Sequence, residues 1–175
     1  MKTIYLVIAF ILLTISSYAQ ESAAIGSTFP NLEAESFDTS YNLPEDSKGK
    51  YTIIGLTYNK KSQEALMDWI VPIYQEFLSD GTESINAYFV IMFSGVNAAA
   101  EGIVRQQVNE SIDPLLLPHI LYHKGGLKKY QEVLDMLGRK DTSYYFILDP
   151  EGTILWATRG RFKQEKIDKI RSLIK

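Results

Sequence analysis

The chain has 175 residues, of which 46% are hydrophobic and 22% charged, and its formal net charge is −3. This length and composition fit one globular domain that can bury a core without disulfides or metals, and the mildly acidic charge gives no sign of a nucleic-acid partner. The sequence contains no cysteine, which excludes thiol–disulfide exchange and cysteine-linked lipid anchors.

Residues 1–19 have the pattern of a secretory signal peptide. Lys2 provides a short positive start, Ile4–Ile15 is largely apolar, and Ser17-Tyr18-Ala19 places small residues where signal peptidase cleaves. The apolar run is shorter than the ~20 residues that span a bilayer. We therefore predict cleavage rather than a stable membrane anchor, and a mature domain of residues 20–175 in the periplasm or outside a bacterial cell.

The first half of the predicted domain contains a strand–turn–helix unit. Residues 32–36 alternate weakly between polar and apolar and predict a short edge strand. Tyr51–Tyr58 is almost continuously apolar or β-branched, as expected of a strand covered on both faces. The polar stretch that follows leads into an amphipathic helix, for which Ser62 is the expected N-cap and Pro72 an expected kink.

The second half contains further strand–helix alternation and then a hairpin. It predicts a buried strand over 86–93, a helix over 98–108 capped by Asn97, an edge strand within 115–122 and a helix over 128–137. Two strands at 143–148 and 153–158 flank the turn Asp149-Pro150-Glu151-Gly152, and a terminal helix covers 163–174. The order predicts an α/β domain with a central mixed sheet flanked by helices.

The sequence contains two tryptophans and two histidines. Trp69 lies on the apolar helix stripe and is assigned to the core, whereas Trp156 on an outer strand could contact another protein. His119 and His123 are four residues apart and would share one face of a strand. Two ligands make a poor metal site, so they are interpreted as surface or half-buried histidines.

The element order resembles that of the thioredoxin-like superfamily over about residues 25–175. The opening Ile25-Gly26-Ser27-Thr28-Phe29-Pro30-Asn31-Leu32 is similar to that of periplasmic thioredoxin-like reductases and peroxiredoxins, and the segment near 115–137 matches their inserted strand and helix. The resemblance implies a thioredoxin-like fold. It also implies a redox site at the first turn of the helix after Tyr58, where this chain has no cysteine.

The positions of the missing cysteines depend on the register chosen. Counting back from Pro72 places them at Glu64 and Met67, and counting forward from the strand places them near Lys61 and Glu64. The position of the superfamily's cis-proline falls on Ser143, whose preceding bond should be trans because a cis bond before a non-proline residue costs about 3 kcal/mol. The vacated site is our candidate binding surface: Asn59, Lys60, Lys61, Ser62, Glu64 and Ser143.

The chain also resembles the mitochondrial ATP synthase assembly factors, which are thioredoxin-like proteins that do not depend on a redox cysteine pair. The matching residues are Ser62-Gln63, Asp68-Trp69, Pro72 and Glu76-Phe77 in the helix, and Tyr145–Asp149, Ile154–Ala157 and Gly160 at the hairpin. The resemblance implies a chaperone-like role on a subunit of a membrane complex. The secretory signal differs from an Arg-rich transit peptide, so only the idea of a non-redox binding module carries over.

These observations predict a redox-inactive binding or chaperone module whose partner is a protein or peptide rather than a nucleic acid. No catalytic residue, metal site or cofactor is predicted. The alternative is an enzyme of non-thiol chemistry that uses Lys60, Lys61, Ser62, Glu64 or the histidines. Ser62 lacks a Gly-x-Ser-x-Gly motif, and Glu64 with Asp68 fits a solvated helix face better than an acid–base pair.

Overall fold

The structure is a computed structural model that describes residues 22–79, 85–139 and 141–174. The predicted signal peptide at 1–19 lies outside these ranges. Within them, no helix is long and apolar enough to cross a membrane.

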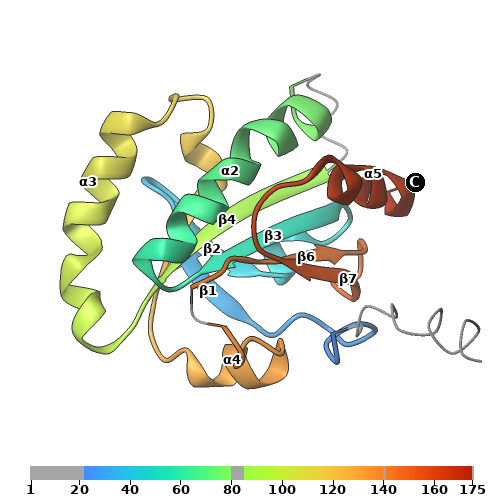
Figure 1. Cartoon of the computed structure of the whole chain (residues 1–175), viewed down its shortest axis with the longest axis horizontal. Coiled ribbons are helices and arrows are strands. Elements are labelled where there is room, and N and C mark those ends of the chain that lie inside the picture. Colours follow the sequence, from blue (N-terminus) through green and yellow to red (C-terminus); the bar gives the residue numbers. More distant parts are fainter. Residues whose placement is uncertain (1–21, 80–84, 140, 175) are drawn as a thin grey trace, which may run out of the picture.

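Seven strands of the described chain form one mixed sheet (Figure 1). In chain order they are β1 (Leu32–Glu35), β2 (Ser40–Leu43), β3 (Tyr51–Thr57), β4 (Ile85–Phe93), β5 (Ile120–Lys124), β6 (Tyr144–Leu148) and β7 (Ile154–Arg159). Their spatial order is β2-β1-β5-β4-β3-β6-β7. β3, β4 and β5 are parallel, so their carboxyl ends lie at the same edge of the sheet, where open α/β sheets bind ligands.

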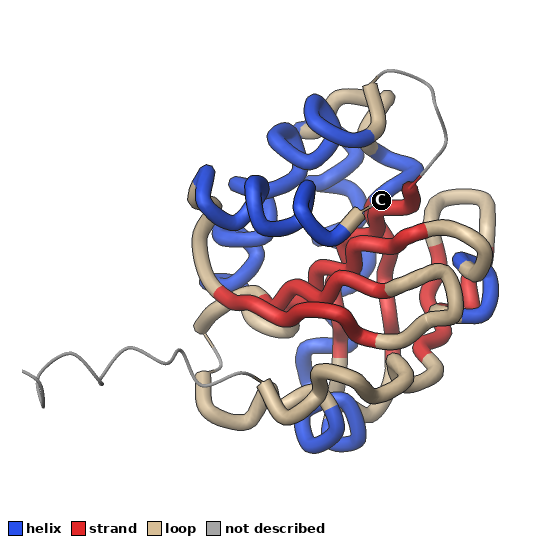
Figure 2. The backbone as a smooth tube through the Cα atoms, turned by 90° about the vertical axis from the view of Figure 1, so that its right-hand side faces the viewer, coloured by secondary structure: helices blue, strands red, loops and turns tan. Residues whose placement is uncertain are grey.

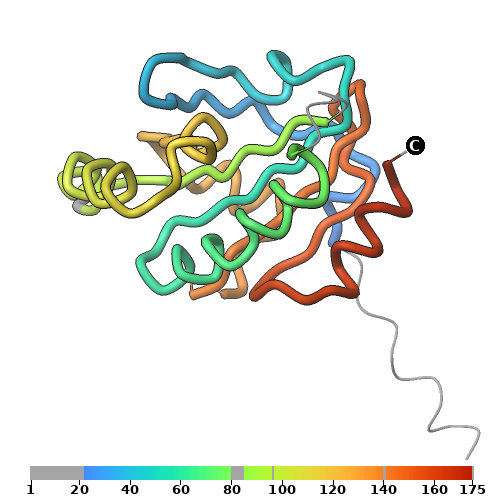
Figure 3. Tube along the Cα trace, turned by 90° about the horizontal axis from the view of Figure 1, so that it is seen from above, coloured from blue at the N-terminus to red at the C-terminus, as the bar shows by residue number. Residues whose placement is uncertain are grey.

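The helices are distributed unequally over the two faces. The described α-helices are α2 (Lys60–Phe77), α3 (Glu101–Ser111), α4 (Lys128–Val133) and α5 (Gln164–Leu173). Figure 2 shows α2, α3 and α5 on one side of the sheet and the short α4 on the other. Figure 3 shows α2 lying between α3 and α5. The segment before β1 completes the α4 side, where Ala24 and Phe29 are buried.

The sheet separates two hydrophobic cores. Because successive side chains of a strand point to opposite faces, Ile53 of β3 packs on the α2 side while Ile54 and Leu56 pack on the α4 side. The prediction that this strand is covered on both faces is confirmed. Trp69 is fully buried, as predicted, and Trp156 is half-buried against the same α2-side core.

Two predicted strand positions are wrong. β1 is interior to the sheet, because the unpredicted β2 pairs along it from Leu32↔Leu43 to Glu35↔Ser40. β5 is also interior, between β1 and β4. The proline that suggested an edge strand, Pro118, lies in the 3₁₀ turn Leu117–His119 before β5, so it removes no hydrogen bond from the sheet.

Several predicted helix boundaries are also wrong. The N-cap of α2 is Asn59 rather than Ser62. Asn97 caps no helix, since it lies within the 3₁₀ segment Gly95–Ala100 and α3 starts only at Glu101. α4 ends at Val133 instead of reaching Leu137, which is 63% exposed. The expected kinking proline, Pro72, lies inside α2, which continues beyond it to Phe77.

Gly55 in β3 allows α2 to lie close to the sheet. A Cβ atom at this position would be 2.9 Å from Leu66 Cδ1, 3.0 Å from Tyr145 Cε1 and 3.2 Å from Phe89 Cδ1. All three side chains are buried in the α2-side core. A Cβ here would force these side chains to shift, so Gly55 helps to set how closely the first half of α2 packs on the sheet.

We expect Gly55→Ala to lower the free energy of unfolding by about 1–3 kcal/mol, because the added methyl group overpacks this contact. Urea unfolding measures the change. The matched control is Gly102→Ala in α3, where an added Cβ meets no atom within 4 Å and where alanine should stabilise the helix slightly. Equal stability of Gly55→Ala and the wild type would contradict this packing.

Candidate functional site

The junction of β3 and α2 is a tightly capped helix start. The Asn59 Oδ1 atom accepts a hydrogen bond from the Lys61 N–H at 2.8 Å. The Ser62 Oγ atom accepts one from the Asn59 N–H at 3.2 Å, which completes a capping box. The sequence correctly indicates a cap near Ser62. The prediction that Ser62 itself is the N-cap is wrong, because Ser62 is the third residue of the helix.

The Ser62 hydroxyl is buried and its hydrogen bonds are satisfied. The residue is 0% exposed. Its Oγ atom is 2.7 Å from the Asn59 carbonyl oxygen, to which it donates, and it forms a second short hydrogen bond with the hydroxyl of Thr57. The Asn59 N–H also donates to this atom. The hydrogen-bonding capacity of Oγ is therefore used within the protein, and none is left for a substrate. The arrangement does not suit a nucleophile.

Ser143 is buried behind the same helix start. It is 0% exposed, and its Oγ atom is hydrogen-bonded to the Tyr145 hydroxyl at 2.9 Å. That hydroxyl also donates to the Ala65 carbonyl in α2 at 3.0 Å. The only cis peptide bond in the described chain joins Leu43 to Pro44, so the predicted trans bond before Ser143 is confirmed.

Tyr145 and Trp69 connect α2 to the hairpin of β6 and β7. Their rings stack with centroids 4.0 Å apart and planes inclined by 24°, and the Trp69 Nε1–H donates to the Gly160 carbonyl at 2.9 Å. Burial raises the pKa of the Tyr145 phenol, so it stays a neutral donor over the physiological range. These contacts stabilise the helix start without exposing a reactive group.

The six predicted site residues therefore fall into two groups. Ser62 and Ser143 belong to the interior. Asn59 is half-buried, and Lys60, Lys61 and Glu64 are exposed. Within the described chain none of these last three side chains forms an ion pair. The exposed residues and Asn59 form one surface, which we call the 59–64 turn, and whether it binds a partner stays a prediction.

The two lysines of this turn are unfavourably placed for the helix. The amino end of a helix carries a partial positive charge, so cations in its first turn destabilise it by about 0.3–1 kcal/mol each. α2 has no acidic residue in its first turn to offset Lys60 and Lys61. The 59–64 turn is consequently a local positive site on an acidic protein.

The two histidines lie on opposite sides of the sheet. The Nδ1 atom of His119 is 3.0 Å from the Ala87 carbonyl oxygen, and its ring packs against Tyr74 of α2. The ring of His123 packs against Tyr130 of α4. The expectation that they share one face is wrong because His119 precedes β5. No group of three or more possible ligands occurs in the described chain.

Comparison with known proteins identifies the fold. No protein-family model and no curated protein matches the chain. Solved structures with the same arrangement include the thioredoxin domain of a thiol-disulfide oxidoreductase from Bacteroides vulgatus, with 14% identity, a TM-score of 0.57 and coverage of 88% of this chain and 100% of that one. The chain has the thioredoxin-like fold.

Two other thioredoxin-like structures also match. The exposed lipoprotein thioredoxin Etrx1 of Streptococcus pneumoniae has 14% identity and a TM-score of 0.57, with 82% of this chain and 99% of that chain covered. Copper-bound yeast Sco1 has 16% identity and a TM-score of 0.52, with 86% and 92% covered. At this identity the likeness concerns the fold alone, and this thioredoxin-like chain has no cysteine.

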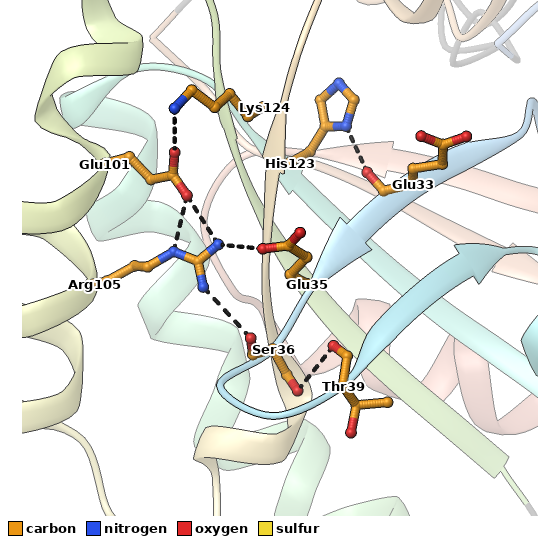
Figure 4. A network of polar contacts seen from close by, with 8 residues as sticks. All are labelled: Glu33, Glu35, Ser36, Thr39, Glu101, Arg105, His123 and Lys124. Carbon is orange, nitrogen blue, oxygen red and sulfur yellow. Dashed lines mark hydrogen bonds and ion pairs between the residues drawn. The ribbon is translucent and has the colours of Figure 1, made fainter.

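A second polar cluster, which sequence reasoning missed, lies where α3 meets the ends of β1 and β5 (Figure 4). The Arg105 guanidinium donates to Glu101, Glu35 and the Ser36 carbonyl, and it lies 4.3 Å from the centre of the Tyr122 ring. Burial raises the pKa of the Glu101 carboxyl, but hydrogen bonds from Arg105 and Lys124 outweigh this effect and hold that pKa below its usual range. The sequence signals near this cluster are the i,i+4 pair of Glu101 and Arg105 and the basic, glycine-containing run at 124–129.

We expect Ser62→Ala to destabilise the fold by about 1–3 kcal/mol, because the Thr57 hydroxyl and the Asn59 N–H lose a buried partner. Urea unfolding measures the loss. Ser172→Ala is the matched control: that hydroxyl also donates to a backbone carbonyl within a helix, Lys169, but it is exposed, so the change should be within about 0.5 kcal/mol. Equal effects of the two substitutions would show that Ser62 is not structurally engaged.

Proposed function

We propose that this protein is an exported, redox-inactive thioredoxin-like module that binds a protein or peptide through the 59–64 turn. The observation that carries the proposal is the state of the vacated redox position. Both hydroxyls there, on Ser62 and Ser143, are buried and hydrogen-bonded within the protein. The groups left for contact are Asn59, Lys60, Lys61 and Glu64, which suit recognition better than chemistry.

The charge of the turn favours an acidic partner. Lys60 and Lys61 add to the positive end of α2, and no ion pair within the described chain neutralises them. A partner with carboxylates would pair with both lysines and with the N–H of Lys60, since the N–H groups of Lys61, Ser62 and Gln63 already donate to Asn59. Charge complementarity of this kind contributes mainly to association rate and to selection of the partner.

Export is supported by the sequence and by one comparison. Residues 1–19 have the three parts of a signal peptide. A structure with the same fold belongs to an exposed bacterial lipoprotein. A chain without cysteine can work in an oxidising compartment without forming wrong disulfides.

Two other functions fit these contacts less well. A non-thiol enzyme at this turn would need a base beside Ser62, but the described hydrogen bonds of His119 and His123 go to the Ala87 and Glu33 carbonyls. An assembly role on a membrane complex, by analogy with the ATP synthase assembly factors, remains a narrower form of the binding proposal. Cross-linking in cells would support it by capturing a membrane subunit.

The proposal predicts that Lys60→Glu/Lys61→Glu abolishes partner binding while it keeps or raises stability. A photo-crosslinking residue at position 64 should capture one specific protein in the wild-type background, and this capture should disappear in the double variant. Urea unfolding should show a gain of about 0.5–1 kcal/mol, because the charges now complement the helix dipole.

The matched control is Lys163→Glu/Lys169→Glu, which makes the same change of net charge at two exposed positions of α5 and its N-cap. It should leave capture from position 64 unchanged. A crosslinker at Glu165, another exposed glutamate near a helix start, controls for the position of the probe. Capture that survives charge reversal at 60 and 61, or that occurs equally from position 165, would refute binding through this turn.

A further inference from the structure

The sheet opens between β1 and β5. β1 pairs with β2 at four positions but with β5 at only one, Glu35↔Tyr122. Next to that pair, a hydrogen bond from the His123 imidazole to the main chain of β1 stands where a backbone hydrogen bond between β5 and β1 would be expected. The Nδ1 atom of His123 is 2.6 Å from the Glu33 carbonyl oxygen, as Figure 4 shows.

This hydrogen bond fixes the tautomer of His123. A carbonyl oxygen can only accept, so Nδ1 carries the hydrogen and, in the neutral ring, Nε2 is an acceptor. His123 is 7% exposed, and its Nε2 atom is buried without a hydrogen-bond partner in the described chain. Buried polar atoms of native proteins are seldom left unpaired, so such an atom calls for an explanation.

The unpaired atom lies against a glycine turn. A Cβ atom on Gly125 would be 3.0 Å from His123 Nε2, so glycine is the residue that leaves this atom room. Gly125 and Gly126 both line a cavity of about 480 Å³, together with His123 and Glu33. Nε2 is buried behind this turn, so a ligand in the cavity would contact it only if the turn shifted outward.

The cavity wall is basic. Lys124 comes from the end of β5, and Lys128 and Lys129 come from the start of α4. Lys124 contacts Glu101 at 3.3 Å and Lys128 contacts Glu132 at 3.8 Å, while Lys129 donates to the Asn31 carbonyl at 3.1 Å and lies 4.6 Å from the centre of the Tyr130 ring. An ammonium group has three donors, so each lysine can still bind an anion.

We propose that this cavity binds a phosphate group, either free or as a monoester of a small molecule. At neutral pH such a group carries about −1.5 to −2 charges, which complements three lysines and one glutamate. The second pKa of a monoester is about 6 and that of inorganic phosphate is higher, so part of either population keeps a P–O–H group that can donate to His123 Nε2. A carboxylate has no proton left to donate at this pH. The cavity volume is that of a small-molecule site and leaves space beyond a phosphate.

A neighbouring cavity of about 620 Å³ does not share this chemistry. It adjoins the first through Glu33 and Lys124 and contains Arg105. Arg105 is already engaged by Glu35, Glu101 and the Tyr122 ring. The acidic residues that line this second cavity outnumber the basic ones, so the cavity does not favour an anion.

The test is an NMR titration of the wild-type protein with ¹⁵N-labelled histidines at pH 7 and constant ionic strength. Inorganic phosphate should shift the Nε2 signal of His123 saturably and leave that of His119, the internal reference, unchanged. Sulfate has a similar shape and charge but no proton, so it should bind about tenfold more weakly. Equal effects of both anions, or no saturable shift, would overturn the proposal.

Glycerol 3-phosphate distinguishes the two sources of the phosphate group. Tighter binding of this ester than of inorganic phosphate would identify a monoester site, and equal binding would identify a site for the phosphate group alone. Both results support the proposal.

Substitutions provide an independent arm. Lys128→Gln/Lys129→Gln should weaken phosphate binding by about tenfold or more, whereas Lys163→Gln/Lys169→Gln on α5 should not change it. Equal affinity in the two double variants would count against the cavity. If the first variant fails to fold, the comparison of phosphate with sulfate on the wild type still decides. This site lies apart from the 59–64 turn, so either proposal can fail alone.

Discussion

The hydrogen bonds of one buried hydroxyl determine what the β3–α2 junction can do. Ser62 links the end of β3, through Thr57, to the N-cap of α2, through the main chain of Asn59. This places the start of α2 directly on the strand and occupies the atom that would otherwise be the candidate nucleophile. The close contact at Gly55 and the stacking of Trp69 on Tyr145 depend on the same placement. The result is a stable helix start whose reactive positions are closed and whose lysines are exposed.

Much of the fold could be predicted from the sequence, because hydrophobic periodicity reports burial directly. The strands at 51–57 and 85–93 and the hairpin of β6 and β7 carry strong local patterns and are close to their predicted bounds. β2 was missed because Ser40–Leu43 contains one buried residue, and its pairing with β1 is a tertiary effect. The interior position of β5 was missed for a related reason. The local hydrophobic pattern of a strand does not determine which strands become its neighbours in the sheet.

The candidate site was only partly predictable. The sequence located the turn and excluded thiol chemistry, but it could not show that Ser62 and Ser143 point inward. The direction of a side chain depends on helix phase, and the predicted start was three residues late. The His123 cavity was not predicted at all, because its walls come from β1, β5 and α4, which are distant in sequence. Sites assembled from several elements leave only weak local signals, here a basic run beside two glycines.

Amide hydrogen exchange at the start of α2 tests the central claim most directly. If the Ser62 hydroxyl closes this junction, the Asn59 N–H, which donates to it, should exchange at least about tenfold more slowly than the N–H of Lys60, for which the described chain offers no hydrogen-bond partner. Ser62→Ala should remove that difference. Equal exchange of the two amides in the wild-type protein would mean that the junction is open, and the account of a closed β3–α2 junction would be contradicted.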